Sequence, residues 1–228
     1  MSLIDLSALL IEWSEERLQI IVAHPDDETL GAGGLIQRAL QGGAACQVVI
    51  VSDGDRRKKK QIRRAEITRA SAHLGLPISS IDFMDFPDGR LATCSGLTSR
   101  LLKGLRDFAP TIVVTGDPLD RRSDHGHLGR LIFDLIPESV AVRRQWGFLI
   151  QYPRFPAPRG FHPGLGLYPP RFPAVRDLRW VSLQITPEEQ ARKRAAIAEY
   201  RSQHHIFLRR LLRSFDRTNE LFRERTGR

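Results

Sequence analysis

The chain contains little cysteine and no long apolar run. Two cysteines, Cys46 and Cys94, occur among 228 residues, too few for a disulfide framework or a cysteine-based zinc site. No apolar stretch approaches the ~20 residues that a membrane-spanning helix requires, and the chain does not open with a basic segment followed by a signal-like apolar one. We therefore expect a soluble, cytoplasmic protein, for which any membrane contact is peripheral and at the inner face.

Acidic residues are fewer than basic ones. The 26 aspartates and glutamates stand against 35 lysines and arginines, which gives a formal net charge of +9. Such a surface favours anionic partners, for example phosphorylated sugars, acidic lipid headgroups or nucleic acid. The sequence has neither aromatic-rich strands nor a zinc finger, so a basic nucleic-acid-binding protein is the less favoured interpretation. The oligomeric state stays open, and an oligomer is compatible with the sequence.

Strand and helix patterns alternate along most of the chain. Apolar or alternating stretches predict strands at residues 18–23, 46–53, 81–86 and 111–115. Helical patterns follow them, at residues 35–40, 62–74, 96–108 and 128–135. This alternation predicts an α/β fold, namely a single Rossmann-like domain over residues 1–228 with a mostly parallel sheet and helices on both faces.

The two ends of the chain are less regular. Residues 3–13 carry apolar side chains at helical spacing, which predicts an amphipathic helix on the core. Residues 153–173 are rich in proline and predict an irregular loop, of a length that is usually functional or mobile. The other expected elements are strands at 146–152 and 178–185, a helix from Pro187 to about Gln203, and a basic amphipathic segment at 207–223.

The residues best suited to chemistry follow the first predicted strand, where the chain reads His24-Pro25-Asp26-Asp27-Glu28. Ligands of open α/β sheets sit at the carboxyl ends of strands. His24 and Asp27 are three residues apart in a tight turn and can reach one metal ion, while Asp26 stays free to take a proton. A catalytic zinc takes about three protein ligands, and His125, after the fourth predicted strand, fits as the third.

Ordinary structural roles can explain the same residues. Asp26 and Asp27 can cap the helix that follows them, and His24 can be a hydrogen-bonded loop histidine. Asp124 can also be a helix cap, with His125 exposed. The two loops together favour the metal site, because both follow strands at the same edge of a parallel sheet.

Three stretches of the sequence resemble one known family. They are Ala23–Glu28, the pair Asp124-His125 before a helix, and Lys193–Gln203. They resemble the PIG-L or LmbE-like family of zinc-dependent N-acetyl deacetylases, and the resemblance extends over about residues 18–222. It implies metal-dependent hydrolysis of the acetamide of an N-acetylated amino sugar, such as an N-acetylglucosamine conjugate.

The resemblance also implies roles for individual residues. His24, Asp27 and His125 would bind Zn²⁺, with Fe²⁺ as the alternative ion. Asp26 would be the general base and would return its proton to the departing amine. Asp124 would orient the His125 ring, or cap the helix.

Arg122 stands where members of the family commonly carry a histidine that stabilises the oxyanion. It could replace that histidine, hold an anion of the substrate, or point into solvent. Arg64 and Asp88 resemble positions that contact the sugar, although Asp88 can simply form a turn. The basic run Arg56–Lys60 is either a solvated surface or part of the site's rim, where it could attract phosphate.

These features predict a small-molecule or lipid-linked N-acetylated sugar as substrate, with an anionic group that suits the basic surface. An amidase that acts on a thiol or other amide conjugate is the nearest alternative. Nucleic-acid binding would explain the charge of the chain but not the run from His24 to Glu28.

Overall fold

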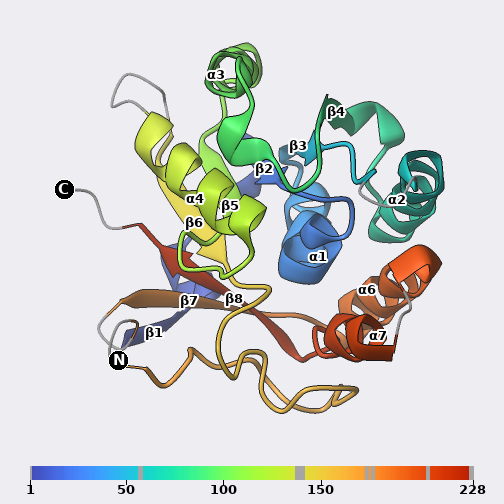
Figure 1. The fold of residues 1–228 in the computed structure, drawn as a ribbon. Coiled ribbons are helices and arrows are strands. Elements are labelled where there is room, and N and C mark those ends of the chain that lie inside the picture. The colour runs from blue at the N-terminus through green and yellow to red at the C-terminus, as the bar shows by residue number, and fades with distance from the viewer. Residues whose placement is uncertain are drawn as a thin grey trace.

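The computed structural model of the protein describes residues 2–55, 59–136, 142–172, 175, 178–203 and 206–225. These residues form one eight-stranded sheet, in the order β1-β7-β8-β6-β5-β2-β3-β4 (Figure 1). The strands are β1 (Ser2–Asp5), β2 (Arg17–Val22), β3 (Ala45–Ser52), β4 (Ile81–Phe86), β5 (Ile112–Gly116), β6 (Arg144–Phe148), β7 (Arg179–Gln184) and β8 (Asn219–Glu224).

The sheet is mostly parallel, as the sequence predicts. Its paired strands run parallel except at β8, which is antiparallel to both of its neighbours, β6 and β7. The part β6-β5-β2-β3-β4 has the strand order of a Rossmann fold, with β2, the first of these strands in the chain, in the middle. The strand order therefore reverses between β2 and β5, which is the position where such folds bind ligands.

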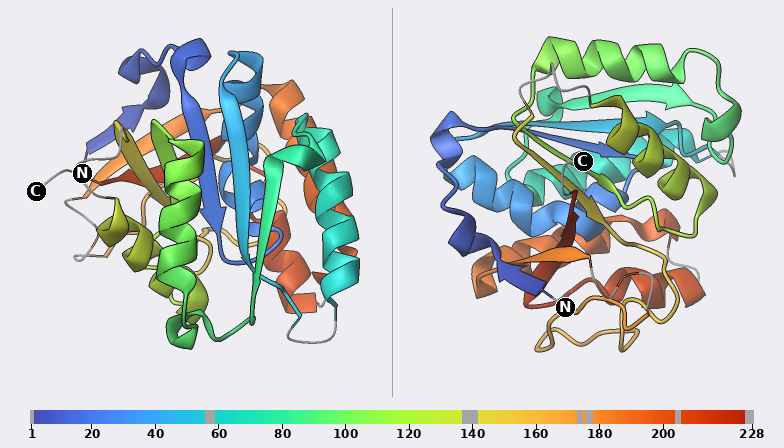
Figure 2. Two further views of the ribbon diagram at one scale, coloured as in Figure 1. Left: turned by 90° about the horizontal axis from the view of Figure 1, so that it is seen from above. Right: turned by 90° about the vertical axis from the view of Figure 1, so that its left-hand side faces the viewer.

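Helices cover both faces of the sheet (Figure 2). The apolar side chains of α1, α2, α6 and α7 pack in one hydrophobic cluster and those of α3 and α4 in a second, on the opposite face. The bounds are α1 (Asp27–Gln41), α2 (Lys60–Leu74), α3 (Leu97–Phe108), α4 (Ser123–Leu135), α6 (Pro187–Glu199) and α7 (Ile206–Arg213). No helix in the described part of the chain combines the length and the apolar character needed to cross a bilayer.

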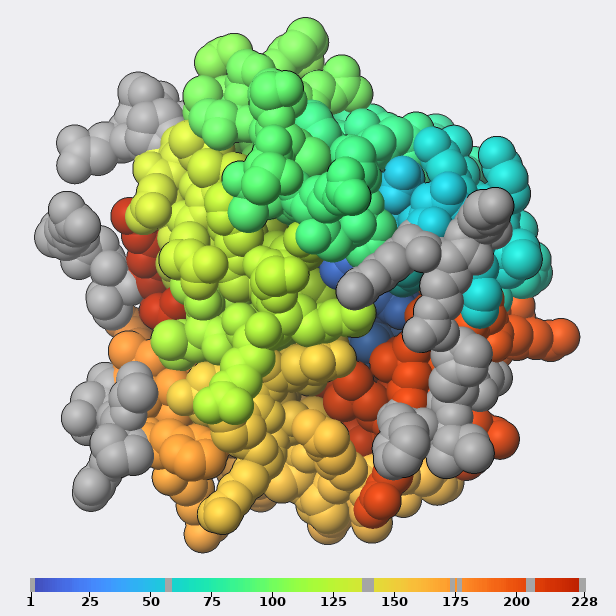
Figure 3. All heavy atoms as spheres, in the orientation of Figure 1, coloured from blue at the N-terminus to red at the C-terminus, as the bar shows by residue number. Residues whose placement is uncertain are grey.

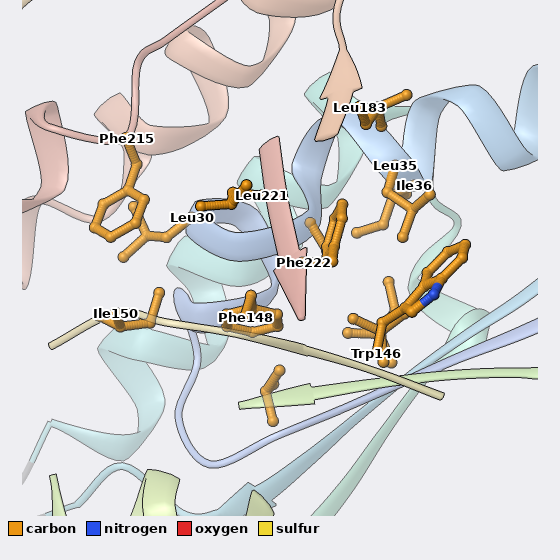
Figure 4. Packing of buried hydrophobic residues seen from close by; sticks show 14 of the residues in the cluster. Leu30, Leu35, Ile36, Trp146, Phe148, Ile150, Leu183, Phe215, Leu221 and Phe222 are labelled. Carbon is orange, nitrogen blue, oxygen red and sulfur yellow. The ribbon is translucent and has the colours of Figure 1, made fainter. Parts of the chain in front are cut away.

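The larger cluster joins the strands near the carboxyl end of the chain to α1. Figure 4 shows Trp146 and Phe148 from β6 packed beside Phe222 from β8, and the rings of Trp146 and Phe222 lie 5.8 Å apart. All three side chains are fully buried. Burying one large apolar side chain contributes roughly 1.5–3 kcal/mol, so this cluster holds β8 firmly within the sheet.

Helix α1 is interrupted near its middle. Ala32 has φ −143° and ψ 17°, outside the helical region. Before the break, Lys193 Nζ donates to the Leu30 carbonyl (2.9 Å), and after it Glu220 accepts two backbone N–H groups, at 2.7 and 2.9 Å. Lys193 and Glu220 are also paired with each other at 2.5 Å and are fully buried. We call these two residues the Lys193–Glu220 clamp.

The amino-terminal segment differs from the predicted helix over residues 3–13. Ser2–Asp5 forms β1, which pairs with β7, and short 3-10 turns follow at Leu6–Leu9 and Trp13–Glu15. Asp5 accepts the Ser7 N–H (2.9 Å) and so caps the first turn. The helical spacing of the leucines was outweighed by pairing with a distant strand, which the local sequence does not encode.

Several boundaries also differ from the prediction. Helix α1 begins at Asp27 instead of residue 35, so Asp27 lies in its first turn. Helix α4 begins at Ser123, five residues earlier than expected, so His125 lies in its first turn instead of in a loop. The basic segment at 207–223 is not one helix, because α7 ends at Arg213 and the chain then continues into β8.

The proline-rich segment is irregular over residues 153–172, as predicted, and Pro173 lies outside the described residues. It is fixed to the chain just before and within β8. The buried Arg217 guanidinium donates to the carbonyls of Pro158 and His162, and Asn219 exchanges hydrogen bonds with the backbone of Leu167. These bonds satisfy loop carbonyls that no secondary structure would otherwise satisfy.

Candidate active site

The candidate site lies where the strand order of the sheet reverses. His24 comes two residues after the end of β2, and His125 lies in the first turn of α4, which follows β5. Because β2 and β5 are adjacent and parallel, the sheet brings together these two histidines, which are 101 positions apart in the sequence. Figure 3 shows blue atoms of the amino-terminal part of the chain at the bottom of a hollow, between green atoms above and yellow and red atoms below.

Three ligand-type atoms converge on one point. His24 Nδ1 and His125 Nε2 are 3.0 Å apart, and Asp27 Oδ2 lies 3.2 Å from His125 Nε2 and 3.5 Å from His24 Nδ1. All three side chains are buried. In tetrahedral zinc coordination with bonds of 2.0–2.1 Å, neighbouring ligand atoms lie about 3.3 Å apart. The three predicted ligands therefore fit a zinc-sized ion without rearrangement.

Asp26 lies beside these ligands in an unusual backbone conformation. Its φ is 127° and its ψ is −30°, a conformation that costs a residue other than glycine roughly 1–3 kcal/mol. The Asp26 N–H is held by Glu28 Oε2 (3.0 Å), and Glu28 in turn accepts hydrogen bonds from Thr29 (2.7 Å) and Tyr200 (2.5 Å). The strain is thus maintained by a buried network that reaches to the end of α6.

Burial raises the pKa of the Asp26 carboxyl to about 7. The Arg63 guanidinium opposes that shift, and the adjacent Asp27 carboxylate adds to it. A carboxyl group with a pKa near neutrality can both take up and release a proton during turnover. This property is the one that a general base requires if it later acts as the acid.

Arg63 lies in the site and Arg64 does not join it. Arg63 donates to the Pro25 carbonyl (2.6 Å), and its Nη atoms lie 3.4 Å from Asp26 and 3.9 Å from Asp88. Arg64, predicted to contact the sugar, instead forms a two-point ion pair with Asp85 at 2.6 and 2.7 Å. The sequence pattern did not single out Arg63, although it directly precedes Arg64 in the same helix.

Carboxylates lie beside the second ring nitrogen of each histidine, the one that does not face the converging atoms. His24 Nε2 lies 3.0 Å from Asp88 Oδ1 and 3.7 Å from Asp124 Oδ2, and His125 Nδ1 lies 3.4 Å from Asp120 Oδ1. Asp120 therefore occupies the position beside His125 that the sequence analysis gave to Asp124. A carboxylate that accepts the second ring N–H of a ligand histidine fixes its orientation and increases its basicity. Asp88 is at hydrogen-bond distance from His24, whereas Asp120 is at ion-pair distance from His125, whose Nδ1 makes no hydrogen bond within the described residues.

Asp124 and Asp88 belong to one connection between α4 and the turn after β4. Asp124 accepts the backbone N–H groups of Gly89 (2.7 Å) and Leu91 (3.3 Å), so it caps that turn and not its own helix. Both oxygens of Asp88 face positively polarised groups of the site, on His24 and Arg63. Asp88 is thus placed to orient His24, in addition to any contact with a sugar.

The pKa values of the charged groups in the site depend strongly on one another. Burial alone lowers the pKa of His125, but Asp27 and Asp120 more than compensate and raise it to about 9. The pKa of His24 is likewise well above its usual value, because Asp124, Asp27 and Asp88 outweigh burial. His125 and His24 in turn hold the pKa of Asp27 well below its usual range, against the effect of its burial. The cluster is therefore arranged to hold positive charge at its centre, supplied by protons or by a metal ion.

Arg122 directly precedes α4, with its side chain exposed. Its backbone N–H donates to Asp120 (3.0 Å). Burial raises the pKa of Asp88, but His24, Arg63 and, to a smaller extent, the charge of Arg122 outweigh burial and lower it. The guanidinium is thus close enough to affect the site electrostatically.

Within the predicted basic run, Arg56, Arg57 and Lys58 lie outside the described residues, whereas Lys60 pairs with Asp85 at 3.1 Å.

Comparison with known sequences gives one matching family profile. The profile of PIG-L, described as GlcNAc-PI de-N-acetylase, matches residues 19–136, just over half of the chain. A 1D-myo-inositol 2-acetamido-2-deoxy-alpha-D-glucopyranoside deacetylase from Mycobacterium sp. (strain KMS) is 27% identical over 209 residues, covering 76% of this chain and 63% of the relative. The chain thus spans less than two thirds of the length of this curated relative.

Comparison with solved structures identifies the fold. An N,N'-diacetylchitobiose deacetylase from Pyrococcus horikoshii matches with a TM-score of 0.67 and 18% identity, over 94% of this chain and 85% of the other. A 4-carboxy-2-hydroxymuconate hydratase from Pseudomonas putida KT2440 matches with a TM-score of 0.63 and 17% identity, over 93% and 97%. Because the fold accommodates both a deacetylase and a hydratase, the reaction has to be argued from the site.

Proposed function

Because the chain belongs to the PIG-L family, we propose that it is a metal-dependent N-acetyl deacetylase. Its reaction would be hydrolysis of the acetamide of an N-acetylated amino sugar to the free amine and acetate. The observation that carries this proposal is the convergence of His24, Asp27 and His125 on one point, within 3.0–3.5 Å of one another, beside a buried aspartate. A zinc or Fe²⁺ ion held there would polarise the acetamide carbonyl and make a water molecule more acidic.

We assign the proton transfers to Asp26. In its ionised form it would take a proton from the attacking water, and in its protonated form it would give that proton to the amine nitrogen as the C–N bond breaks. A pKa of about 7 suits both steps. Arg63 would keep the Asp26 carboxylate oriented from 3.4 Å away, while Glu28 fixes the strained backbone that aims it.

We propose that Arg122 acts at the rim of the site. Its charge could stabilise the negative oxygen that develops as water adds to the acetamide, a role in which losing one donor costs about 2.7–4 kcal/mol. The alternative is that it holds an anionic group of the substrate. The two roles differ in kinetics, since the first lowers kcat and the second raises KM when Arg122 is replaced.

We propose an N-acetylglucosamine-type conjugate as the substrate class. The names of the mycobacterial relative and of the Pyrococcus structure both describe deacetylases of N-acetylated glucosamine units. The net charge of +9 favours a conjugate with an anionic portion, which could be lipid-linked. A cytoplasmic location is part of the same proposal.

The test is acetate release from N-acetylglucosamine derivatives that are free, phosphorylated, nucleotide-linked, inositol-linked or lipid-linked. The protein would be loaded separately with zinc and with Fe²⁺, and Asp26→Asn and His125→Ala would be compared with wild type. Asp134→Asn is the matched control, because Asp134 is an exposed acid on the same helix as His125. We expect release by wild type and by the control only, with metal retained in Asp26→Asn and lost in His125→Ala.

The outcomes separate the alternatives. Metal binding without acetate release from any derivative would contradict the deacetylase and favour the amidase, to be tested next with acylated thiol conjugates. Failure of wild type to bind either metal would contradict both enzymatic interpretations.

A further inference from the structure

Two segments outside the candidate site carry arginines without any acidic residue. The segments 153–172 and 206–215 contain six arginines and no aspartate or glutamate. All six are exposed: Arg154, Arg159, Arg171, Arg209, Arg210 and Arg213. None of the six has a carboxylate partner among the residues that the structure describes, whereas Arg38, Arg64 and Arg69 are paired. We call the surface of segment 153–172 and helix α7 the basic face.

Contacts between the two segments make the basic face one surface. The Gly160 N–H donates to Ser214 Oγ (2.7 Å), and the Arg213 guanidinium lies 5.1 Å from the centre of the Phe161 ring. The buried Arg217 guanidinium also fixes the loop, because it donates a hydrogen bond to the His162 carbonyl (3.3 Å). In Figure 1 the loop runs along the lower end of the molecule, next to α7. The arginines of both segments can therefore meet the same partner at once.

The basic face also exposes large apolar side chains. Phe161 and Leu165 are each 46% exposed and Tyr168 is 68% exposed, so three of the seven large hydrophobic side chains that are exposed in the described part of the chain lie within eight positions of the loop. Beside them is a cavity of about 210 Å³, with Phe161, Ile197 and Leu212 among its apolar lining residues and Arg209 and Arg213 among its charged ones. Exposed apolar side chains that are grouped with cations lacking a carboxylate partner indicate an interaction surface, not an ordinary solvated one.

We propose that the basic face binds the surface of a lipid bilayer that contains anionic headgroups. Arginines attract anionic headgroups, and aromatic and leucine side chains enter the boundary between headgroups and acyl chains. A polyanion such as nucleic acid would satisfy the arginines but would leave Leu165 exposed to water. The combination of both kinds of side chain on one fixed surface therefore favours the bilayer.

Docking on this face would place the candidate site beside the membrane. The yellow and red atoms that border the lower side of the hollow in Figure 3 come from the same part of the chain as the loop and α7. A substrate with its sugar at the membrane surface would then reach the site without leaving the bilayer. The binding itself does not depend on the proposed reaction and can be measured without any activity assay.

The experiment is co-sedimentation of the full chain with vesicles of phosphatidylcholine alone or mixed with phosphatidylglycerol. We expect binding to the mixed vesicles at about 0.1 M salt, where charges still attract over ~10 Å. Replacing three arginines of α7 (Arg209→Gln, Arg210→Gln and Arg213→Gln) should weaken that binding on the order of 100-fold, at about fivefold for each charge. The matched control removes the same charge from exposed positions of α3, with Arg100→Gln, Lys103→Gln and Arg106→Gln, and should bind nearly as wild type does.

A second triple variant tests the apolar part of the proposal. Phe161→Ser, Leu165→Ser and Tyr168→Ser keep every charge, and should remove the portion of vesicle binding that persists when the salt concentration is raised. Circular dichroism would confirm that each variant is folded. The proposal is wrong if wild type does not sediment with the mixed vesicles, or if the α3 control loses as much binding as the α7 variant. It is also wrong if the loop variant binds as wild type does while single-stranded DNA competes fully, which would identify a general polyanion site.

Discussion

Two regions of the molecule bury charged groups to a similar extent but treat them in opposite ways. In the Lys193–Glu220 clamp, the ammonium group and both carboxylate oxygens each contact an oppositely polarised group of the chain at 2.5–2.9 Å. In the candidate site, ring nitrogens of His24 and His125 and an oxygen of Asp27 point at one another. All three of those atoms can carry lone pairs, so together they suit one shared cation, whereas the clamp pairs its carboxylate with the Lys193 ammonium group.

The contrast separates buried charge that stabilises a fold from buried charge that serves chemistry. The clamp satisfies the backbone groups left free where α1 breaks at Ala32, and no external ligand could improve its hydrogen bonding. In the site, burial raises the pKa of Asp26, whereas the pKa values of His24 and His125 are raised by neighbouring carboxylates that outweigh burial. A buried cluster of ligand-type atoms that converge on one point is a stronger indication of function than burial alone.

The largest expected effect is on catalysis through Asp26. Asp26→Asn keeps the size of the side chain and removes its ability to take a proton, so kcat should fall by about 10²–10⁴-fold. Metal content, measured by atomic emission on the same samples, should stay at the wild-type level. A variant that loses metal together with activity would show that Asp26 is a ligand instead of a base.

The next largest effect is on stability through the clamp. Lys193→Met leaves Glu220 buried without its partner and should lower the free energy of unfolding by about 3–5 kcal/mol. Urea unfolding of the metal-free protein would measure it. The double variant Lys193→Met with Glu220→Gln should recover part of the loss, and a double variant as unstable as the sum of both single changes would contradict the pairing.

A smaller effect, on metal affinity, is expected from Asp120 in the candidate site. Asp120→Asn removes the carboxylate that lies 3.4 Å from His125 and should weaken metal affinity by about 10–100-fold. Competition with a fluorescent zinc chelator would measure the change. Asp124→Asn should weaken metal affinity through His24 instead; if Asp124→Asn and not Asp120→Asn disturbed the titration of His125 in NMR spectra, the assignment of Asp120 would be wrong.

The pH dependence of metal binding follows from the raised pKa of His125. Its pKa of about 9 means that the ring is protonated at neutral pH in the metal-free protein and must lose that proton when a metal binds. Affinity should therefore rise with pH, by up to about tenfold for each unit below 9. Calorimetry in buffers of different ionisation enthalpy would count the protons released, and a count of zero at pH 7 would contradict the shift.

The smallest effect is expected at Arg64, which lies next to Arg63 in the chain but outside the site. Arg64→Gln breaks a half-exposed ion pair with Asp85, so stability should change by about 1 kcal/mol or less. Arg63→Gln should reduce kcat much more, because it removes the charge beside Asp26. Equal effects of the two substitutions on kcat would contradict the distinction between them.

The sequence was sufficient for the strands from β2 to β7, the covering helices and the three converging candidate ligands, because apolar periodicity and strand-end motifs are local signals. It was not sufficient to choose Arg63 over Arg64, since neighbouring helical residues point about 100° apart and the phase of α2 depends on its packing. Asp120 was missed for a related reason. Which acid faces which ring depends on where α4 begins, and the helix begins five residues before the predicted start.

The amino-terminal strand could not be predicted from its own residues. β1 exists because it pairs with β7, whose residues come 177 positions later in the register. The leucines of the segment have a helical spacing, and local propensity is weaker than pairing with a complete sheet. The same limitation applies to the basic segment at 207–223, whose second part becomes a strand between β6 and β7.

The position of β8 has a consequence for the order in which the protein can be made. Residues 219–224 are inserted between β6 and β7, and Glu220 caps the break in α1. After His24 and Asp27 have been synthesised, the ribosome must still add nearly two hundred residues before Glu220 can cap the helix that carries Asp27. Until then the nascent sheet would consist of two separate pieces with open edges, which are surfaces that chaperones bind.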